Sequence, residues 1–179
     1  MIESFNGKSP RIAGTAFVHP SAHIRGDVEI GEYSIIWPGA SIAGDDGLIR
    51  IGNCVMIEDN AVIHGGSYDH WKEGRKSLLE IGDFVTIGHS AVVHSNRIGS
   101  RVLIGMNSTV LSHTEIGDYC VVAAGTVVPE GTVVPDRSLA AGNPAKVIPL
   151  AQKHVDMFSG NEDNLSFYME YIRKWREGI

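Results

Sequence analysis

A branched apolar residue recurs every six positions along most of this chain. A period of six does not fit an α-helix, because the apolar stripe would move round a cylinder that turns every 3.6 residues. It does not fit a series of βαβ units either, because no helical segment separates the short strands. The recurring residues are Val18, Ile24, Ile30, Ile36, Ile42, Ile51, Ile57, Ile63, Ile81, Ile87, Val93, Ile98, Ile104, Val110, Ile116, Val122, Val128 and Val134.

Glycine often follows the recurring residue, for example at Gly31, Gly88 and Gly117. Glycine reaches positive φ without a steric penalty, so it suits a chain that turns after each short strand. A triangular coil with one hexad per side places every branched residue inside, and each turn then covers the backbone of the next. The eighteen hexads predict an all-β solenoid, a parallel β-helix of about six turns.

The repeat ends after Val134, so we expect a β-helix domain at residues 1–138 and a C-terminal segment at residues 139–179. The C-terminal segment begins with the turn sequence Gly-Asn-Pro-Ala-Lys and continues with a helical pattern. Apolar residues fall at helical spacing on one side of that α-helix, and we expect them to pack against a flat face of the coil. They are Leu165, Tyr168, Met169, Ile172 and Trp175.

The hexads are interrupted between Ile63 and Ile81, where residues 65–80 form the longest departure inside the repeat. We predict an inserted loop there. Loops carried by a rigid scaffold are where binding and catalytic residues concentrate. The residue at the base of this loop is His64.

The charge balance and the cysteine usage limit the partners and the compartment. A formal net charge of −6 without a Lys/Arg run disfavours nucleic-acid binding. The first residues lack the basic and apolar regions of a signal peptide, and no stretch of about 18 apolar residues could span a bilayer. Cys54 and Cys120 then indicate reduced thiols. We therefore expect a cytoplasmic protein with no membrane or nucleic-acid partner.

Three histidines share a pattern that favours a metal site. His64 and His94 each follow a recurring apolar residue directly, so both occupy the same slot of the hexad on neighbouring turns. His89 lies two residues after Ile87, on the previous side of the triangle, and faces a different direction. One subunit cannot bring the three imidazoles to one ion, whereas a three-fold trimer can combine His64 and His94 of one subunit with His89 of the next. Three neutral imidazoles with an open fourth position form a catalytic zinc site.

Two segments around these histidines, residues 57–64 and 87–94, resemble the ligand motifs of the gamma-class carbonic anhydrase family. The resemblance extends from about Ala13 to the C-terminal helix. It implies a left-handed coil, although the general rule for parallel crossovers is right-handed. It also implies a homotrimer with a divalent metal on His64, His89 and His94, which interconverts CO2 and bicarbonate by hydroxide held on the metal. Zinc is the expected ion, and iron or cobalt would also suit imidazole ligands.

The resemblance further implies that acidic residues orient the hydroxide and accept its proton, and the candidates are Asp45, Glu58 and Asp59. The sequence departs from the family at three positions. Ala43 stands in place of an arginine that pairs with an aspartate across the subunit interface, Met56 in place of an asparagine, and Glu58 in place of a glutamine. The extra carboxylate would stabilise a cation while making its water less acidic.

In one branch of the family a glutamate in the loop after the first ligand shuttles protons. The inserted loop of this chain offers Ser67, Asp69, His70 and Glu73 for that role.

Two other functions fit the sequence. A hexapeptide acyltransferase would bind coenzyme A in a groove between adjacent coils and would need one catalytic histidine and no metal. The pairing of His89 with His94 speaks against that class, and the turn at 142–146 is shared by both classes. A catalytically inactive trimer that keeps the metal would fit the departures at Ala43, Met56 and Glu58.

Overall fold

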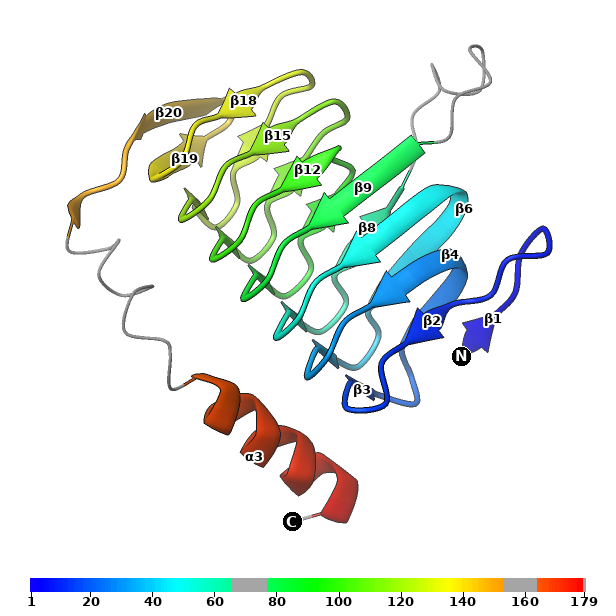
Figure 1. The fold of residues 1–179 in the computed structure, drawn as a ribbon. Helices are drawn as coiled ribbons and strands as arrows, with labels where there is room; N and C mark the ends of the chain where they lie inside the picture. Colours follow the sequence, from blue (N-terminus) through cyan, green and yellow to red (C-terminus); the bar gives the residue numbers. More distant parts are fainter. Residues whose placement is uncertain (66–76, 153–163, 179) are drawn as a thin grey trace.

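The computed structural model describes residues 1–65, 77–152 and 164–178. These residues form a left-handed parallel β-helix of about seven turns, with helix α3 (Asn164–Glu177) lying against one side (Figure 1). Within the part of the chain that the structure describes, no helix has the length and apolar character needed to cross a membrane.

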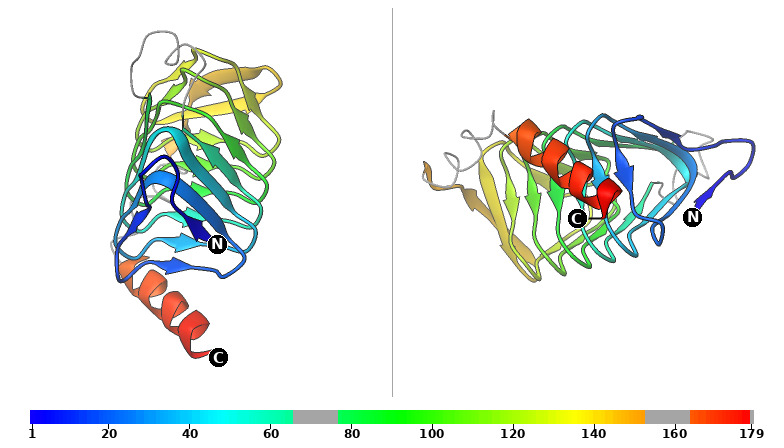
Figure 2. Two further views of the ribbon diagram at one scale, coloured as in Figure 1. Left: turned by 90° about the vertical axis from the view of Figure 1, so that its right-hand side faces the viewer. Right: turned by 90° about the horizontal axis from the view of Figure 1, so that it is seen from below.

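The coil has three faces, each built by parallel strands from successive turns (Figure 2). The first face contains β3 (Phe17–Val18), β5 (Ile35–Ile36), β7 (Met56–Ile57), β10 (Thr86–Ile87), β13 (Leu103–Ile104), β16 (Val121–Val122) and β19 (Ser138–Gly142), and β20 (Ala145–Pro149) adds to β19 in antiparallel sense. The second face contains β1 (Ile2–Glu3), the first halves of β4 (His23–Ile30) and β6 (Ser41–Ile51), β8 (Val62–His64), β11 (Val92–Val93), β14 (Thr109–Val110) and β17 (Val127–Val128). The third face contains β2 (Arg11–Ile12), the second halves of β4 and β6, β9 (Ser77–Ile81), β12 (Arg97–Ile98), β15 (Glu115–Ile116) and β18 (Val133–Val134).

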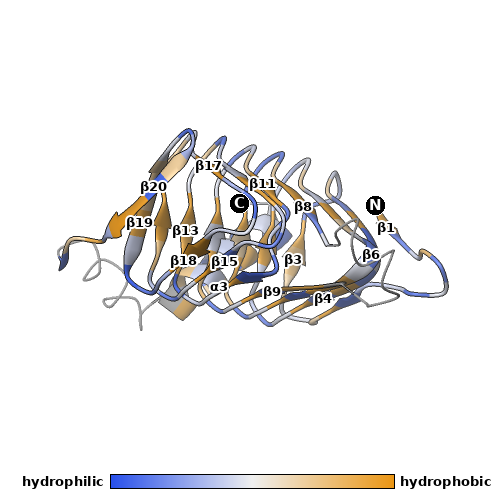
Figure 3. Ribbon diagram, turned by 90° about the horizontal axis from the view of Figure 1, so that it is seen from above, coloured by the Kyte–Doolittle hydropathy of each residue, from blue (hydrophilic) through white to orange (hydrophobic). Residues whose placement is uncertain are grey.

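The recurring apolar residues stack inside this coil, as the six-residue period predicts. On the first face, for example, Ile87 pairs in register with Ile57 and with Ile104. All of the recurring residues are buried except Val18, which is partly buried in the first turn. Figure 3 shows the result as apolar strands joined by more polar corners.

The coil is about one turn longer than the sequence predicted. Ile12 lies six residues before Val18 and packs against the core, and Ala140 lies six residues after Val134 and is fully buried. The strand that carries Ala140 runs parallel to β16, so the coil continues past the expected domain boundary at residue 138. Alanine is not a branched residue, so the spacing of branched residues does not reveal the strand that carries Ala140.

The predicted loop at residues 65–80 is too long at its C-terminal end. Residues 77–80 belong to β9, which pairs in register with Gly47–Ile51 of β6, and Leu79 is fully buried. β6 continues without a break from the second face to the third, and this long strand holds Asp45 and Asp46 at the corner between them.

Helix α3 packs on outward-facing side chains of the first face. Tyr168 and Ile172 are buried together with Ile35, Cys54 and Met56. Burial raises the pKa of Tyr168 to about 12.

The buried stripe of α3 differs from the predicted one. Of the predicted residues, Leu165 and Met169 are exposed, and Trp175 contacts the rings of Phe17 and Trp37 as expected. Tyr171, which was not predicted, stacks on Trp37. The aromatic side chains of the first turns therefore pack against the aromatic side of the helix, which the predicted stripe covered only in part.

The third face carries a ladder of alternating charge on its outer surface, one residue per turn. Arg11 donates to Glu29 at 2.7 Å, and Arg50 bridges Glu29 at 3.0 Å and Glu80 at 2.9 Å. Directly opposite charges on neighbouring strands stabilise a sheet, and like charges destabilise it. In strand register the ladder reads Arg11, Glu29, Arg50, Glu80, Arg97 and Glu115.

The close spacing of the coils makes Gly105 intolerant of a side chain. A Cβ atom at this position would lie 2.5 Å from the backbone nitrogen of Ala124 on the next turn. We expect Gly105→Ala to lower the free energy of unfolding by about 1–3 kcal/mol or more through this clash. Gly14→Ala is the control, because a Cβ there has nothing within 4 Å. Urea denaturation of both variants checks the difference, and equal stability would contradict the close packing of the coils.

Candidate metal centre

His64 and His94 lie side by side at the end of the second face. His64 is the last residue of β8, and His94 directly follows β11 on the next turn. Nδ1 of His64 is 2.9 Å from Nε2 of His94, and the ring centroids are 4.9 Å apart. The shared slot in the hexad therefore brings these two imidazoles together within one subunit.

Asp45 holds His64 from the corner of β6. Its Oδ1 lies 2.9 Å from Nε2 of His64, and its Oδ2 accepts hydrogen bonds from Nε and Nη2 of Arg25. Burial raises the pKa of the Asp45 carboxyl, but the hydrogen bonds from Arg25 and His64 outweigh burial, so the pKa lies below its ordinary value. The group is therefore ionised at neutral pH and accepts the proton on His64 Nε2 in a hydrogen bond. Asp46 lies farther from the same nitrogen, with Oδ2 at 3.5 Å.

His94 is held from its other side by Ser112, whose Oγ lies 2.9 Å from Nδ1 of His94. Burial lowers the pKa of His94, and a proton on the neighbouring His64 would act in the same direction. Both effects favour the neutral imidazole, which is the form that binds a metal.

His89 lies at the opposite edge of the second face, in the corner after β10. Its ring stands between two carboxylates: Nδ1 is 3.1 Å from Oδ2 of Asp59, and Nε2 is 3.3 Å from Oε2 of Glu58. The same Glu58 oxygen accepts the backbone N–H of His89 at 3.1 Å. The rings of Trp37 and His89 are perpendicular, with ring centroids 6.4 Å apart.

The three histidines are thus divided between two half-sites of one subunit. In residues 1–65, 77–152 and 164–178, the group of three ligand-type side chains whose atoms lie within 4.8 Å of one another is Asp45, Asp46 and His64, without His89 or His94. Of the predicted acidic residues, Asp45 accompanies His64, whereas Glu58 and Asp59 accompany His89. The predicted shuttle residues Ser67, Asp69, His70 and Glu73 lie outside the described residues.

Arg25 and Ser112 are site residues that the sequence reasoning missed. A signal for Arg25 was present, because it directly follows the recurring residue Ile24 and so occupies the same slot as His64 and His94. The strand register pairs Arg25 with Ala43, and Ala43 with His64. Ser112 carries no such signal, because it lies in a corner that the repeat does not constrain.

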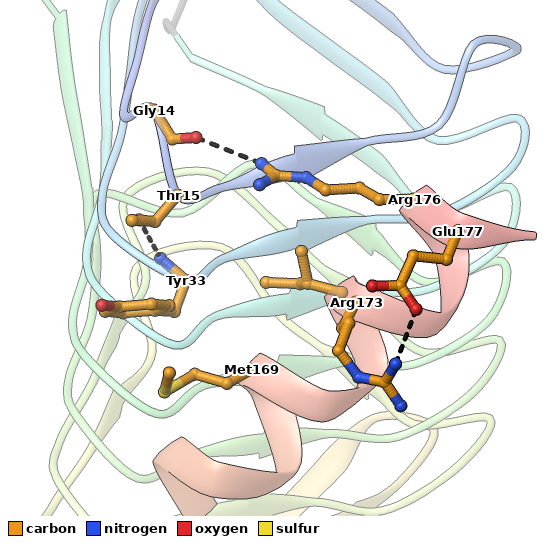
Figure 4. A pocket seen from close by; sticks show the side chains of 8 residues that line it. Gly14, Thr15, Tyr33, Met169, Arg173, Arg176 and Glu177 are labelled. Carbon is orange, nitrogen blue, oxygen red and sulfur yellow. Dashed lines mark hydrogen bonds and ion pairs between the residues drawn. The ribbon is translucent and has the colours of Figure 1, made fainter.

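A pocket elsewhere on the molecule lies between α3 and the first turn of the coil (Figure 4). Its arginines are engaged by the protein itself. Arg176 donates to the carbonyl oxygens of Gly14 and Ala16 at 3.1 Å, and Arg173 pairs with Glu170 and Glu177. The contacts of Arg176 attach the helix to the coil, whereas the pairs of Arg173 lie within α3.

The repeat and the coil define a hexapeptide-repeat β-helix protein, and residues 9–44 and 97–130 match the family model described as bacterial transferase hexapeptide (six repeats). A carbonic anhydrase of Geobacillus kaustophilus is 40% identical over 148 residues, which cover 83% of this chain and 77% of that protein. The mitochondrial gamma carbonic anhydrase 2 of Arabidopsis thaliana is 38% identical over 78% of this chain, and the chain spans 49% of that relative's length. The crystal structure of a putative acetyltransferase from Bacillus cereus is also similar, with a TM-score of 0.83, 32% identity, and coverage of 99% of this chain and 98% of that chain. The chain belongs to the gamma-class carbonic anhydrase family.

Proposed function

We propose that this protein is a homotrimeric, metal-dependent enzyme that interconverts CO2 and bicarbonate at three equivalent sites between subunits. Each site would combine His64 and His94 of one subunit with His89 of the next. The observation that carries the proposal is the position of the two half-sites, at opposite edges of the second face. The relatives named carbonic anhydrase support the same reaction.

Apolar side chains on the second face support the trimer. Val62, Val92 and Leu111 point outward from the second face and are 39%, 40% and 39% exposed. Apolar side chains that gather on one face favour association, because burial removes them from water. A cyclic trimer that buries this face would bring the His89 edge of one subunit to the His64 edge of its neighbour.

The side chains present fit a metal ion. The facing nitrogens of His64 and His94 are 2.9 Å apart, and a tetrahedral zinc ion at about 2.0–2.1 Å from each would separate two such nitrogens by about 3.3 Å. A small opening of this pair is therefore sufficient. Bound there, a divalent ion would supply hydroxide at neutral pH by lowering the pKa of water to about 7. Three imidazoles accept zinc, and also iron or cobalt.

The surrounding residues would orient the ligands and move the proton. Asp45 holds the ring of His64 and Ser112 holds the ring of His94, as outer partners of metal ligands commonly do. Glu58 and Asp59 place two carboxylates beside His89. We assign to Glu58 the role of accepting the proton released when water is converted to hydroxide, because its oxygen already lies within reach of the His89 ring.

The acyltransferase alternative is supported by the likeness to the putative acetyltransferase of Bacillus cereus. An acyltransferase needs one histidine as a base, and it gives no reason for two imidazole nitrogens to face each other at 2.9 Å. An inactive metal trimer is the remaining alternative. The lack of an arginine at position 43 supports the inactive trimer. This support is weakened because Asp45 still has an arginine partner, Arg25, within the subunit.

Metal content and CO2 hydration test this function together. We expect protein purified without added metal to carry about one divalent ion per subunit. In His94→Ala we expect the metal to be lost and CO2 hydration to fall by about 100-fold or more. His19→Ala is the control, because His19 lies on the first face against Trp175. Elemental analysis and stopped-flow hydration assays measure both quantities. Wild-type protein that holds no metal but binds acetyl-CoA saturably would favour acyl transfer, and metal without hydration would favour the inactive trimer.

A further inference from the structure

Arg25 lies beside position 43, where this chain has alanine in place of the family's arginine. It lies one turn before Ala43 in the same slot, and Ala43 lies one turn before His64. Ala43, which lies between them in register, carries only a methyl side chain. Nε and Nη2 of Arg25 reach Oδ2 of Asp45 at 2.9 and 2.5 Å.

We propose that Arg25 is a positioning residue for the metal centre: it fixes Asp45, and Asp45 selects the ring nitrogen of His64 that carries the proton. The inference rests on the proposed function of this site. It concerns a residue of the second turn that touches none of the three histidine ligands.

The argument starts from the two oxygens of Asp45. An ionised carboxylate accepts hydrogen bonds and donates none. Oδ2 is occupied by Arg25, so Oδ1 faces Nε2 of His64 at 2.9 Å and holds the proton on that nitrogen. A neutral imidazole carries one proton, and Nδ1 of His64 is therefore left with a free lone pair. That nitrogen is the one that faces His94.

His94 is not fixed in the same way. The Ser112 hydroxyl beside its Nδ1 can donate or accept a hydrogen bond. Without an ion, Nε2–H of His94 can donate to Nδ1 of His64, and Ser112 then donates to Nδ1 of His94. In the form that would bind an ion, His94 would carry its proton on Nδ1 and donate a hydrogen bond to the Ser112 hydroxyl. One histidine is set in advance by Arg25 and Asp45, and the other adapts.

Loss of Arg25 would release this arrangement. The Asp45 side chain is only 16% exposed, so its orientation depends on the few groups that bind it. Without the two N–H donors of Arg25, the carboxylate can turn away from His64. The proton can then occupy Nδ1 of His64, which blocks the nitrogen that faces His94.

The test compares Arg25→Gln with Arg11→Gln in metal-free protein. Arg11 is a matched control, because it is an ion-paired arginine like Arg25 but pairs with Asp27 and Glu29 on the third face. Nitrogen NMR of ¹⁵N-histidine-labelled protein reports the tautomer, and the His64 signals are assigned by their loss in His64→Gln. We expect His64 to be protonated at Nε2 in the wild type and in Arg11→Gln, and to be a mixture of both tautomers in Arg25→Gln. Arg25→Lys keeps the positive charge but cannot donate from two nitrogens to the same carboxylate oxygen. We expect its fraction of Nε2-protonated His64 to lie between those of the wild type and Arg25→Gln.

Cobalt binding gives the second readout. We expect Arg25→Gln to weaken Co²⁺ affinity by about 10- to 100-fold, and to add nothing when Asp45→Asn is already present. Thermal unfolding and light scattering confirm that the variants fold and assemble, and Arg25→Lys serves in place of a variant that does not. If Arg25→Gln matches Arg11→Gln in tautomer and affinity, or weakens binding equally in the Asp45→Asn background, the proposal is wrong. The tautomer measurement needs no metal. If the wild type binds no Co²⁺ but Arg25→Gln still changes the His64 tautomer, the proposed function is refuted and the link from Arg25 to His64 is retained.

Discussion

Mixing two inactive variants restores activity if each site is shared between subunits. His89→Ala damages one half-site and leaves His64 and His94 intact, whereas His94→Ala damages the other half-site and leaves His89 intact. Each homotrimer alone has three incomplete sites. In a mixed trimer, a site is complete wherever the intact halves of the two variants meet, and random assembly completes about a quarter of the sites. We expect CO2 hydration and bound metal to recover to that fraction of the wild-type values.

Co-expression of the two variants with different affinity tags measures this recovery. Trimers purified through both tags contain one complete site in three, so their activity should be about a third of the wild-type value. A mixture of His64→Ala and His94→Ala is the matched control, because both changes damage the same half-site and no combination repairs it. Recovery in the control, or none in the test pair despite mixed trimers, would show that the histidines do not meet across an interface.

The second large effect is expected from a cavity in the core, one turn after the turn that carries His89. Ile104 is fully buried and stacks between Ile87 and Val122 on the first face. We expect Ile104→Ala to lower the free energy of unfolding by about 2–5 kcal/mol, through lost burial and the cavity that remains. In a coil each turn contacts only its neighbours, so the loss falls on the turn of Ile104 and on the two turns beside it, one of which carries His89.

Leu103→Ala is the control for this change, because Leu103 is the adjacent residue on the same strand and is 37% exposed. We expect its effect to stay within about 1 kcal/mol. Urea denaturation of metal-free protein measures both variants. Equal effects at the two positions would contradict the inward stacking of the repeat.

The sequence predicted the coil well because one period determines it. A branched residue every six positions has few ways to reach an interior, and the described strands place nearly all of these residues there. The ends were less predictable. Ala140 occupies an inner position without a branched side chain, and residues 77–80 pair along β6 although they follow a long interruption. Both cases depend on contacts with the neighbouring turn, which spacing alone does not reveal.

The candidate site divides in the same way. The shared slot predicted that His64 would lie beside His94, and the structure brings them to 2.9 Å. The role of Arg25 was missed because its contact with Asp45 spans twenty residues of sequence and one turn of the coil. The sequence lacks the arginine that pairs across the interface at position 43, and it does not reveal that Asp45 has an arginine partner within the subunit, Arg25. The joining of His89 to the other two stays a prediction, which the mixed trimers test.

A three-sided coil has three faces through which it could contact another copy of itself. Here the outer chemistry distinguishes the sides. Helix α3 covers the first face with aromatic side chains. The ladder of alternating charge keeps the third face hydrated, and a second copy would match it only in particular registers. The remaining side offers valines and leucine between two halves of a metal centre. The chemistry of the three outer surfaces would therefore direct association to this face. It would disfavour assemblies through the other faces, in which the histidines of two subunits could not meet.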